Sequence, residues 1–166
     1  MSYDVDIKQL SLMALFDLKG TQSALAEWCG EVLPAFPEQA MRMTFKDQRE
    51  LMFVGPEHYL LRAPLDQETT LLDKLQPEEA PVDISLVRVS DTLTFFSVSG
   101  PDAGEVMAIA SPLDTHFDMF PAQSVTFSEA FTVKALILRT NDAFHLGVER
   151  SYGPMIADYL SRATAD

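Results

Sequence analysis

The fold is decided early in the chain, where residues 9–29 read QLSLMALFDLKGTQSALAEWC. Apolar side chains recur at every second position from Leu10 to Leu18, and this period predicts a strand with one face in a core. Gly20 ends the strand, Thr21 offers an N-cap, and apolar residues then recur at helical spacing. The stretch therefore predicts a strand followed by a short helix.

Similar parts follow along the rest of the chain. Helices are expected to begin at Thr21, Asp66, Ser99 and Ser151, so that corresponding starts lie about 80 to 85 positions apart. Strands are expected at residues 41–45, 51–54, 59–62, 82–89, 93–98, 125–127, 131–139 and 143–148. The segments 82–89 and 93–98 are expected to form a hairpin.

This repetition predicts an α+β fold. We expect one domain over residues 1–166, in which two similar strand–helix halves, about 1–80 and 81–166, share one core. Hydrophobic residues make up 47% of the chain, which is enough for a packed core without metal or disulfide support.

The net charge of the chain limits the classes of partner that it can bind. The 166 residues include 12 Lys and Arg against 25 Asp and Glu, which gives a net charge of −13. Because binding to phosphate groups depends on Lys and Arg, nucleic acids and anionic membranes are poor partners for this chain.

The expected compartment is the cytoplasm. The N-terminal residues show neither the basic nor the apolar region of a targeting leader, and the longest apolar runs, at 12–18 and 134–138, are strand-sized. Cys29 is the only cysteine, which excludes an internal disulfide and a zinc site built on several cysteines. We expect a soluble protein.

The sequence contains no recognisable catalytic motif. Gly100 and Gly104 do not form a phosphate-binding loop, and there is no Gly-x-Ser-x-Gly nucleophile motif. Cys29 lies on the apolar stripe of a predicted helix, which indicates a buried, inert thiol. His58 is predicted in a turn and His145 in a strand, and neither has a partner at a recognisable spacing. We therefore predict no catalytic, cofactor-binding or metal-binding residues in this chain.

Residues 114–118 allow an alternative interpretation, a metal site. If residues 114–118 were extended, Asp114, His116 and Asp118 would point the same way and could hold a metal ion. The structural interpretation, which we favour, is that Asp114 caps a helix after Pro112.

Several short blocks resemble, in order and spacing, the gamma subunit of heterotetrameric sarcosine oxidase, over almost the whole chain. The blocks are ALA at 24–26, LP at 33–34, LMFVGPEHYLL at 51–61, VDIS at 82–85, VSGPDA at 98–103, PLD at 112–114, FP at 120–121, RTNDAF at 139–144 and RSY at 150–152. The portions Asp-x-Ser, Gly-Pro-Asp-Ala and Leu-Asp also resemble the folate-binding fold of the glycine-cleavage aminomethyltransferase, to which that subunit is related.

The resemblance implies a subunit of an enzyme that oxidatively demethylates sarcosine to glycine, with tetrahydrofolate as the one-carbon acceptor. It implies that FAD, FMN, NAD and tetrahydrofolate are bound by the large flavoprotein subunits, which would be the partners of this chain. The gamma chain itself would be a non-catalytic, structural subunit that carries no cofactor.

The chain also departs from the related patterns. The aminomethyltransferase has paired glycines before an essential aspartate on one strand, whereas residues 129–138 contain neither Gly-Gly nor Asp. Phe53 and Tyr59 stand where many gamma subunits have tryptophan, and Ser111 stands where cysteine is common. The essential aspartate of the aminomethyltransferase pattern therefore has no counterpart in this segment.

Two further hypotheses stay open. The first is a stand-alone folate-binding module, although folate is an anion and the basic residues Arg42, Lys46 and Arg49 are scattered. The second is a small metal-dependent enzyme that uses the three side chains at positions 114, 116 and 118.

Overall fold

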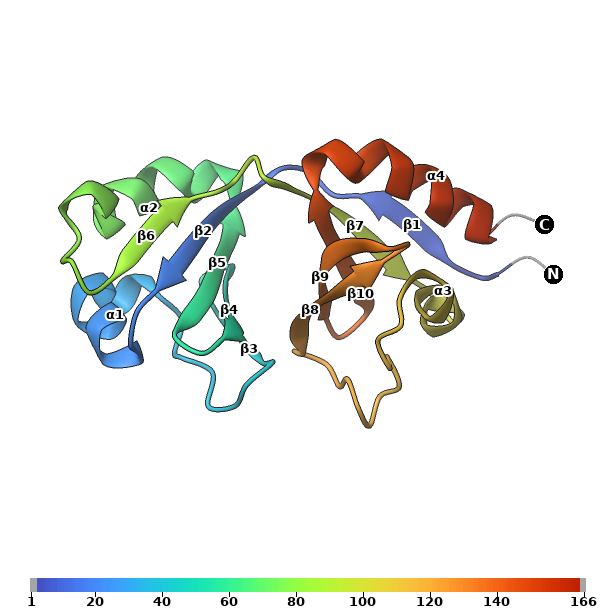
Figure 1. Cartoon of the computed structure of the whole chain (residues 1–166), viewed down its shortest axis with the longest axis horizontal. Helices are drawn as coiled ribbons and strands as arrows, with labels where there is room; N and C mark the ends of the chain where they lie inside the picture. The colour runs from blue at the N-terminus through green and yellow to red at the C-terminus, as the bar shows by residue number, and fades with distance from the viewer. Residues whose placement is uncertain (1–2, 165–166) are drawn as a thin grey trace. The chain divides into compact units, whose positions relative to one another are not determined.

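The computed structural model describes residues 3–164, and Figure 1 labels its helices and strands. They belong to two compact units. The first unit consists of residues 12–91, and the second unit consists of residues 3–11 together with residues 92–164. Each unit contains a five-stranded antiparallel sheet and two α-helices, so the predicted α+β class is confirmed.

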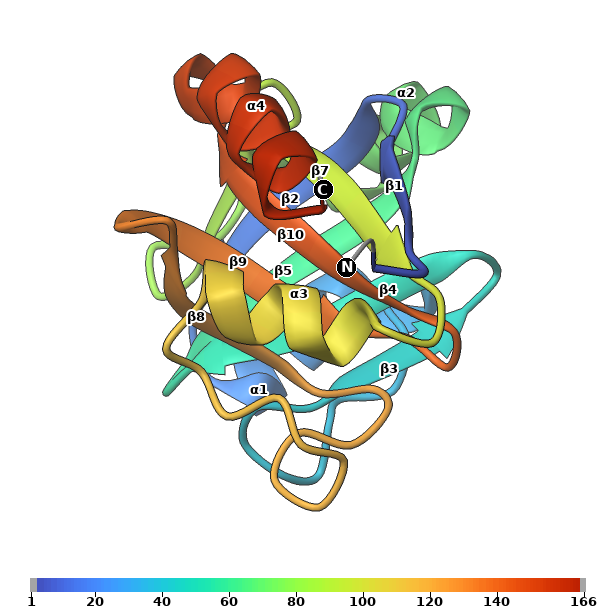
Figure 2. The ribbon, with the colours of Figure 1, turned by 90° about the vertical axis from the view of Figure 1, so that its right-hand side faces the viewer.

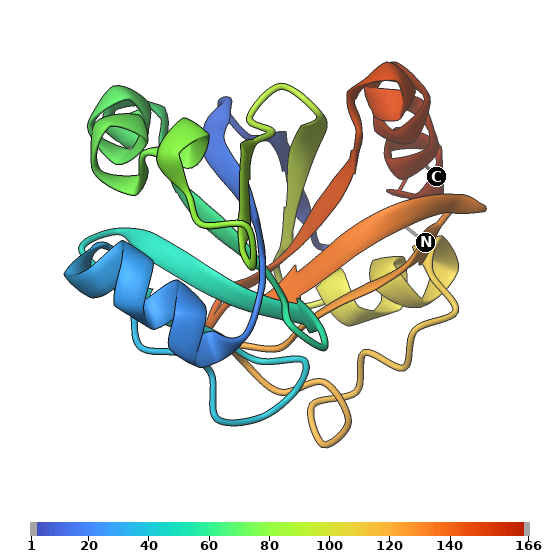
Figure 3. The same ribbon diagram turned by 60° about the vertical axis from the view of Figure 1, so that its left-hand side comes forward.

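The sheet of the first unit has the strand order β3-β4-β5-β2-β6. Helices α1 and α2 pack on one face of this sheet (Figure 3). The hydrophobic cluster of the unit combines alternate strand residues, such as Phe16 and Leu61, with Leu25 of α1 and Leu71 of α2. The elements are β2 Met13–Lys19, α1 Gln22–Cys29, β3 Met43–Lys46, β4 Arg49–Gly55, β5 His58–Pro64, α2 Glu68–Leu75 and β6 Ser85–Arg88, with 3-10 turns η1 Gly30–Val32, η2 Leu65–Gln67 and η3 Pro77–Glu79.

The sheet of the second unit has the strand order β1-β7-β10-β9-β8. Helices α3 and α4 pack on one face of it (Figure 2). Its hydrophobic cluster combines Val98, Ile137 and other strand residues with Val106 of α3 and Ile156 of α4. The elements are β1 Asp6–Gln9, β7 Leu93–Ser99, α3 Ala103–Ala110, β8 Val125–Ala130, β9 Val133–Arg139, β10 Ala143–Glu149, η4 Arg150–Tyr152 and α4 Gly153–Thr164.

Only one of the expected helix starts is confirmed at its residue. The Thr21 side chain caps α1 by accepting the Ala24 N–H at 3.2 Å. The other helices, α2, α3 and α4, begin two to four residues later than expected, because 3-10 turns precede α2 and α4 and a turn at residues 101–102 precedes α3. Asp66 lies inside the 3-10 turn η2 and does not cap α2.

The expected hairpin over residues 82–98 is wrong. Strand β6 pairs with β2 in the first sheet, and β7 pairs with β1 and β10 in the second sheet. Residues 89–92 therefore connect two sheets. Turn-forming residues between two apolar segments indicate a change of direction, but they do not specify which strand pairs with which.

The first expected strand, from Leu10 to Leu18, is likewise divided between the two units. Strand β1 pairs with β7, and the Leu10 N–H continues this pairing by donating to the Phe95 carbonyl at 2.8 Å. Strand β2 then pairs with β5 and β6. As a result, residues 3–11 belong with the later part of the chain and residues 82–91 with the earlier part, so the units do not divide at residue 80.

None of the helices within residues 3–164 is long and apolar enough to cross a membrane.

Candidate functional site

Cys29 lies at the end of α1 and is buried, as the helical spacing predicted. Burial raises the pKa of its thiol to about 11, because the charged thiolate would lose its water. The thiol therefore stays protonated at neutral pH, and a protonated, buried thiol is a poor nucleophile.

His58 has a partner that the sequence did not reveal. It begins β5, and its Nε2–H donates to Asp17 Oδ1 of β2 at 2.7 Å. Lys19 Nζ lies 4.0 Å from the other oxygen of the same carboxylate. Asp17 thus holds two basic side chains at the edge of a hollow of about 460 Å³. His145, on β10, lies opposite Ser97 and Leu138 on the neighbouring strands.

The alternative of a metal site at residues 114–118 is not supported by the geometry. Asp114 Oδ1 accepts the backbone N–H of His116 at 2.9 Å, and His116 and Asp118 extend into solvent with side chains 71% and 83% exposed. Within residues 3–164 no three His, Cys, Asp or Glu side chains gather closely enough to hold a metal ion. Asp114 does not cap a helix either, because a turn follows it, so this expectation was wrong.

The feature that stands out is the long segment between α3 and β8, residues 111–124, which we call the Arg139 loop. Arg139, at the end of β9, holds it from two sides: Nη1 donates to the carbonyls of Thr115 at 2.9 Å and Phe120 at 3.0 Å. The backbone of Arg139 also pairs with Gln123 and Ser124, at 2.8 and 2.9 Å. A loop of this length without regular structure is uncommon in a compact fold unless it is functional.

Aromatic rings complete the attachment. The guanidinium carbon of Arg139 lies 5.2 Å from the centre of the Phe117 ring and 4.8 Å from that of Phe144, within the range of cation–π attraction. The Phe120 side chain is buried in the hydrophobic cluster of the second unit. The loop is therefore anchored on its inner side by both polar and apolar contacts.

The outer side of the loop exposes large apolar side chains. Phe117 is 59% and Met119 is 68% exposed, and the acidic residues Asp114 and Asp118 lie beside them in the chain. A hollow of about 380 Å³ separates this loop from α3. Aromatic and Met side chains are enriched in protein–protein interfaces, where they carry much of the binding energy. We define Phe117 and Met119, with the two aspartates, as the loop surface.

The sequence matches no protein-family model, and it matches no curated protein sequence. Solved structures, in contrast, define the class: the chain has the α+β fold shared by aminomethyltransferases and sarcosine oxidase.

In particular, a chain of the heterotetrameric sarcosine oxidase from Corynebacterium sp. U-96, solved in complex with pyrrole 2-carboxylate, is similar with a TM-score of 0.82 and 19% identity. That match covers 98% of this chain and 86% of the other. Glycine cleavage system aminomethyltransferase T from Bartonella henselae follows with a TM-score of 0.71 and 12% identity, covering 96% of this chain but only 46% of the enzyme. The regulatory subunit of aspartate kinase from Thermus thermophilus has a TM-score of 0.53, at 12% identity and 99% and 100% coverage. At these identities the likeness establishes the fold.

Proposed function

We propose that this chain is a non-catalytic assembly subunit of a heterotetrameric enzyme of the sarcosine oxidase type. The observation that carries the proposal is the full-length match, since 98% of this chain and 86% of a chain from such a heterotetramer superpose with a TM-score of 0.82. The sequence blocks that resemble the gamma subunit of this enzyme support the same assignment.

In this proposal the complex oxidatively demethylates sarcosine to glycine in the cytoplasm, with tetrahydrofolate as the one-carbon acceptor. The large flavoprotein subunits bind FAD, FMN, NAD and tetrahydrofolate, and this chain binds none of them. The buried, protonated thiol of Cys29 agrees with a role that needs no reactive group.

The loop surface supplies the contact that such a role requires. Burying a phenylalanine or methionine side chain is worth about 1.5–3 kcal/mol, and both side chains already lie outside the core of this chain. A net charge of −13 favours a basic partner surface, which accelerates encounter without adding much affinity.

Co-purification with the large flavoprotein subunits at moderate salt tests the proposal. The double variant Phe117→Ala/Met119→Ala should keep the fold and weaken the complex by roughly 30- to 1,000-fold, which corresponds to about 2–4 kcal/mol. The matched control is Met41→Ala/Phe45→Ala, which removes the same side-chain types from the first unit, where they are 44% and 47% exposed. Isolation of the wild-type chain free of the large subunits would refute the proposal.

Two measurements on the isolated chain separate this proposal from the stand-alone folate-binding module. The assembly role predicts no heat on calorimetric titration with tetrahydrofolate and no turnover of sarcosine. Stoichiometric binding of tetrahydrofolate would favour the folate module instead.

A further inference from the structure

Strand β6 forms an open edge of the sheet in the first unit, because it is the last strand in the order β3-β4-β5-β2-β6. The Val89 N–H donates to the Leu15 carbonyl at 2.7 Å, directly after β6. Since backbone groups along an antiparallel strand alternate between its two sides, Ser85 and Val87 also face β2. The N–H and C=O groups of Leu86 and Arg88 therefore point away from the sheet and can pair with another strand.

A hollow of about 650 Å³ runs along this edge, between β6 and the segment formed by α2 and η3. Its apolar lining includes Leu72, Leu86 and Val87, and its acidic lining includes Asp73, Glu78 and Glu79. The three carboxylates come from α2 and η3, whereas the Val87 side chain is half-exposed on β6. Backbone groups, apolar contacts and negative charge thus occur together at one edge.

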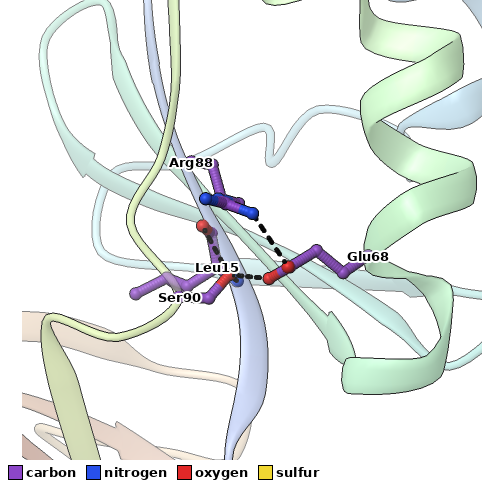
Figure 4. Close-up of polar contacts among 4 residues, drawn as sticks. All are labelled: Leu15, Glu68, Arg88 and Ser90. Carbon is purple, nitrogen blue, oxygen red and sulfur yellow. Dashed lines mark hydrogen bonds and ion pairs between the residues drawn. The ribbon is translucent and has the colours of Figure 1, made fainter.

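The edge is held in a fixed position by polar contacts to α2 (Figure 4). Glu68, the first residue of α2, accepts hydrogen bonds from the Arg88 side chain at 3.3 Å and from the Ser90 hydroxyl. The same Ser90 oxygen accepts the Leu15 N–H at 3.0 Å. Arg88 also lines the hollow, but its positive charge is offset by its pairing with Glu68, so the three acidic residues leave the hollow negative.

We propose that β6 binds an extended segment of a partner protein in which basic and apolar side chains alternate. Side chains of an added strand point alternately to the two faces of the sheet. One face carries α2, so that basic side chains on that face meet Asp73, Glu78 and Glu79 while their methylene groups pack on Leu72. The apolar side chains lie on the other face, beside Val87.

A second copy of this chain fits the edge poorly. Pairing two β6 strands would bring both sets of acidic residues to one hollow, and like charges at such short range oppose association. The inference goes beyond the proposed function and does not depend on it, since it concerns a different surface and a ligand defined by chemistry alone.

Hydrogen exchange on the full chain, measured by NMR, tests the proposal with a short capped peptide of alternating Lys and Val as the probe. In the free protein the amides of Leu86 and Arg88, which point away from β2, should exchange faster than the Val87 amide, which faces β2. Saturating peptide should slow the first two by at least about tenfold and leave Val87 unchanged. A peptide that leaves Leu86 and Arg88 unprotected would overturn the proposal.

Two controls separate strand pairing from general attraction to an acidic protein. The same peptide with N-methyl groups on alternate amides keeps its charge but loses the N–H donors on one edge of the strand. It should not protect the amide of Leu86 or that of Arg88. The variant Glu78→Lys/Glu79→Lys should weaken peptide binding by at least about tenfold. The charge-matched variant Glu27→Lys/Glu38→Lys, with both changes at exposed positions outside the hollow, should bind as wild type.

The remaining outcomes are equally decisive. Equal binding of both peptides, or equal loss in both charge variants, would show non-specific attraction and contradict the proposal. Concentration-dependent protection of Leu86 and Arg88 in the free chain would show pairing between copies and would also contradict it. Neither result bears on the loop surface, whose test uses the separate variants at Phe117 and Met119.

Discussion

Replacing Arg139 by alanine should release the loop that it holds. The change removes two hydrogen bonds from a charged donor, to the carbonyls of Thr115 and Phe120, and two cation–π contacts. Hydrogen bonds from charged groups contribute about 1.5–3 kcal/mol each, but Arg139 is only half-buried and water can replace part of the loss. We therefore expect the free energy of unfolding to fall by about 2–3 kcal/mol.

The loss of stability should be concentrated in the middle of the Arg139 loop. The backbone bonds of residue 139 to Gln123 and Ser124 remain, and so does the buried ring of Phe120. The N–H groups of Met119 and Phe120, which donate to the His116 carbonyl at 3.0 and 2.8 Å, should then exchange roughly 30- to 150-fold faster, because each 1.4 kcal/mol is a factor of ten.

Urea titration measures the stability, and hydrogen exchange locates the change. Arg162→Ala is the matched control: it removes an arginine of the same unit that forms an exposed pair with Asp158 at 2.9 Å, and it should cost less than about 0.5 kcal/mol. The reasoning fails if Arg139→Ala costs as little as the control. It also fails if stability falls while Met119 and Phe120 keep their protection.

The other predictions concern packing, hydrogen bonding and burial within each unit. Gly147→Ala would place a Cβ 2.5 Å from the ring of buried Phe95 and should lower the free energy of unfolding, measured in urea, by about 1–3 kcal/mol. Gly104→Ala, at an exposed position of α3, meets nothing within 4 Å and should raise it by about 0.5–1 kcal/mol. Ser90→Ala removes a buried hydroxyl and should lower the free energy of unfolding by about 1–3 kcal/mol. An unchanged midpoint of urea unfolding would show that the contacts of this hydroxyl contribute nothing to stability. Because folding raises the pKa of Cys29 from 9.0 to about 11, the folded thiol should react with iodoacetamide about 100-fold more slowly than the unfolded thiol at pH 8. Folding favours the protonated form, so stability should fall as the pH rises from 9.0 to about 11, which thermal unfolding across that range would detect.

The sequence specified the local elements better than their partners. Alternation identified β2 because a half-buried strand must place apolar residues at every second position. It did not show that β1 pairs with β7 or that β6 pairs with β2, because pairing depends on contacts between residues more than 60 positions apart. Ser90 illustrates the difficulty: in the sequence it indicates a turn, whereas its side chain joins Leu15 and Glu68.

The loop surface was hidden from the sequence for a similar reason. Arg139 belongs to a block that resembles a known family, but its two acceptors are backbone carbonyls 24 and 19 positions away, and a carbonyl carries no signal in the sequence. In the same way, the pattern of the loop does not distinguish the buried Phe120 from the exposed Phe117. A segment without periodicity leaves the direction of its apolar side chains undetermined.

The contacts that hold the loop surface and strand β6 in place determine the kind of binding that the chain can support. Ordering a flexible side chain on binding costs about 0.5–1.5 kcal/mol, and ordering a loop costs more. Arg139 fixes the backbone beneath Phe117 before any partner arrives, and the contacts of Glu68 fix β6 beside its hollow. A partner therefore meets surfaces that are held in place before it binds, so that less of the binding free energy is lost to ordering them. A chain whose proposed task is assembly depends on surfaces of this kind.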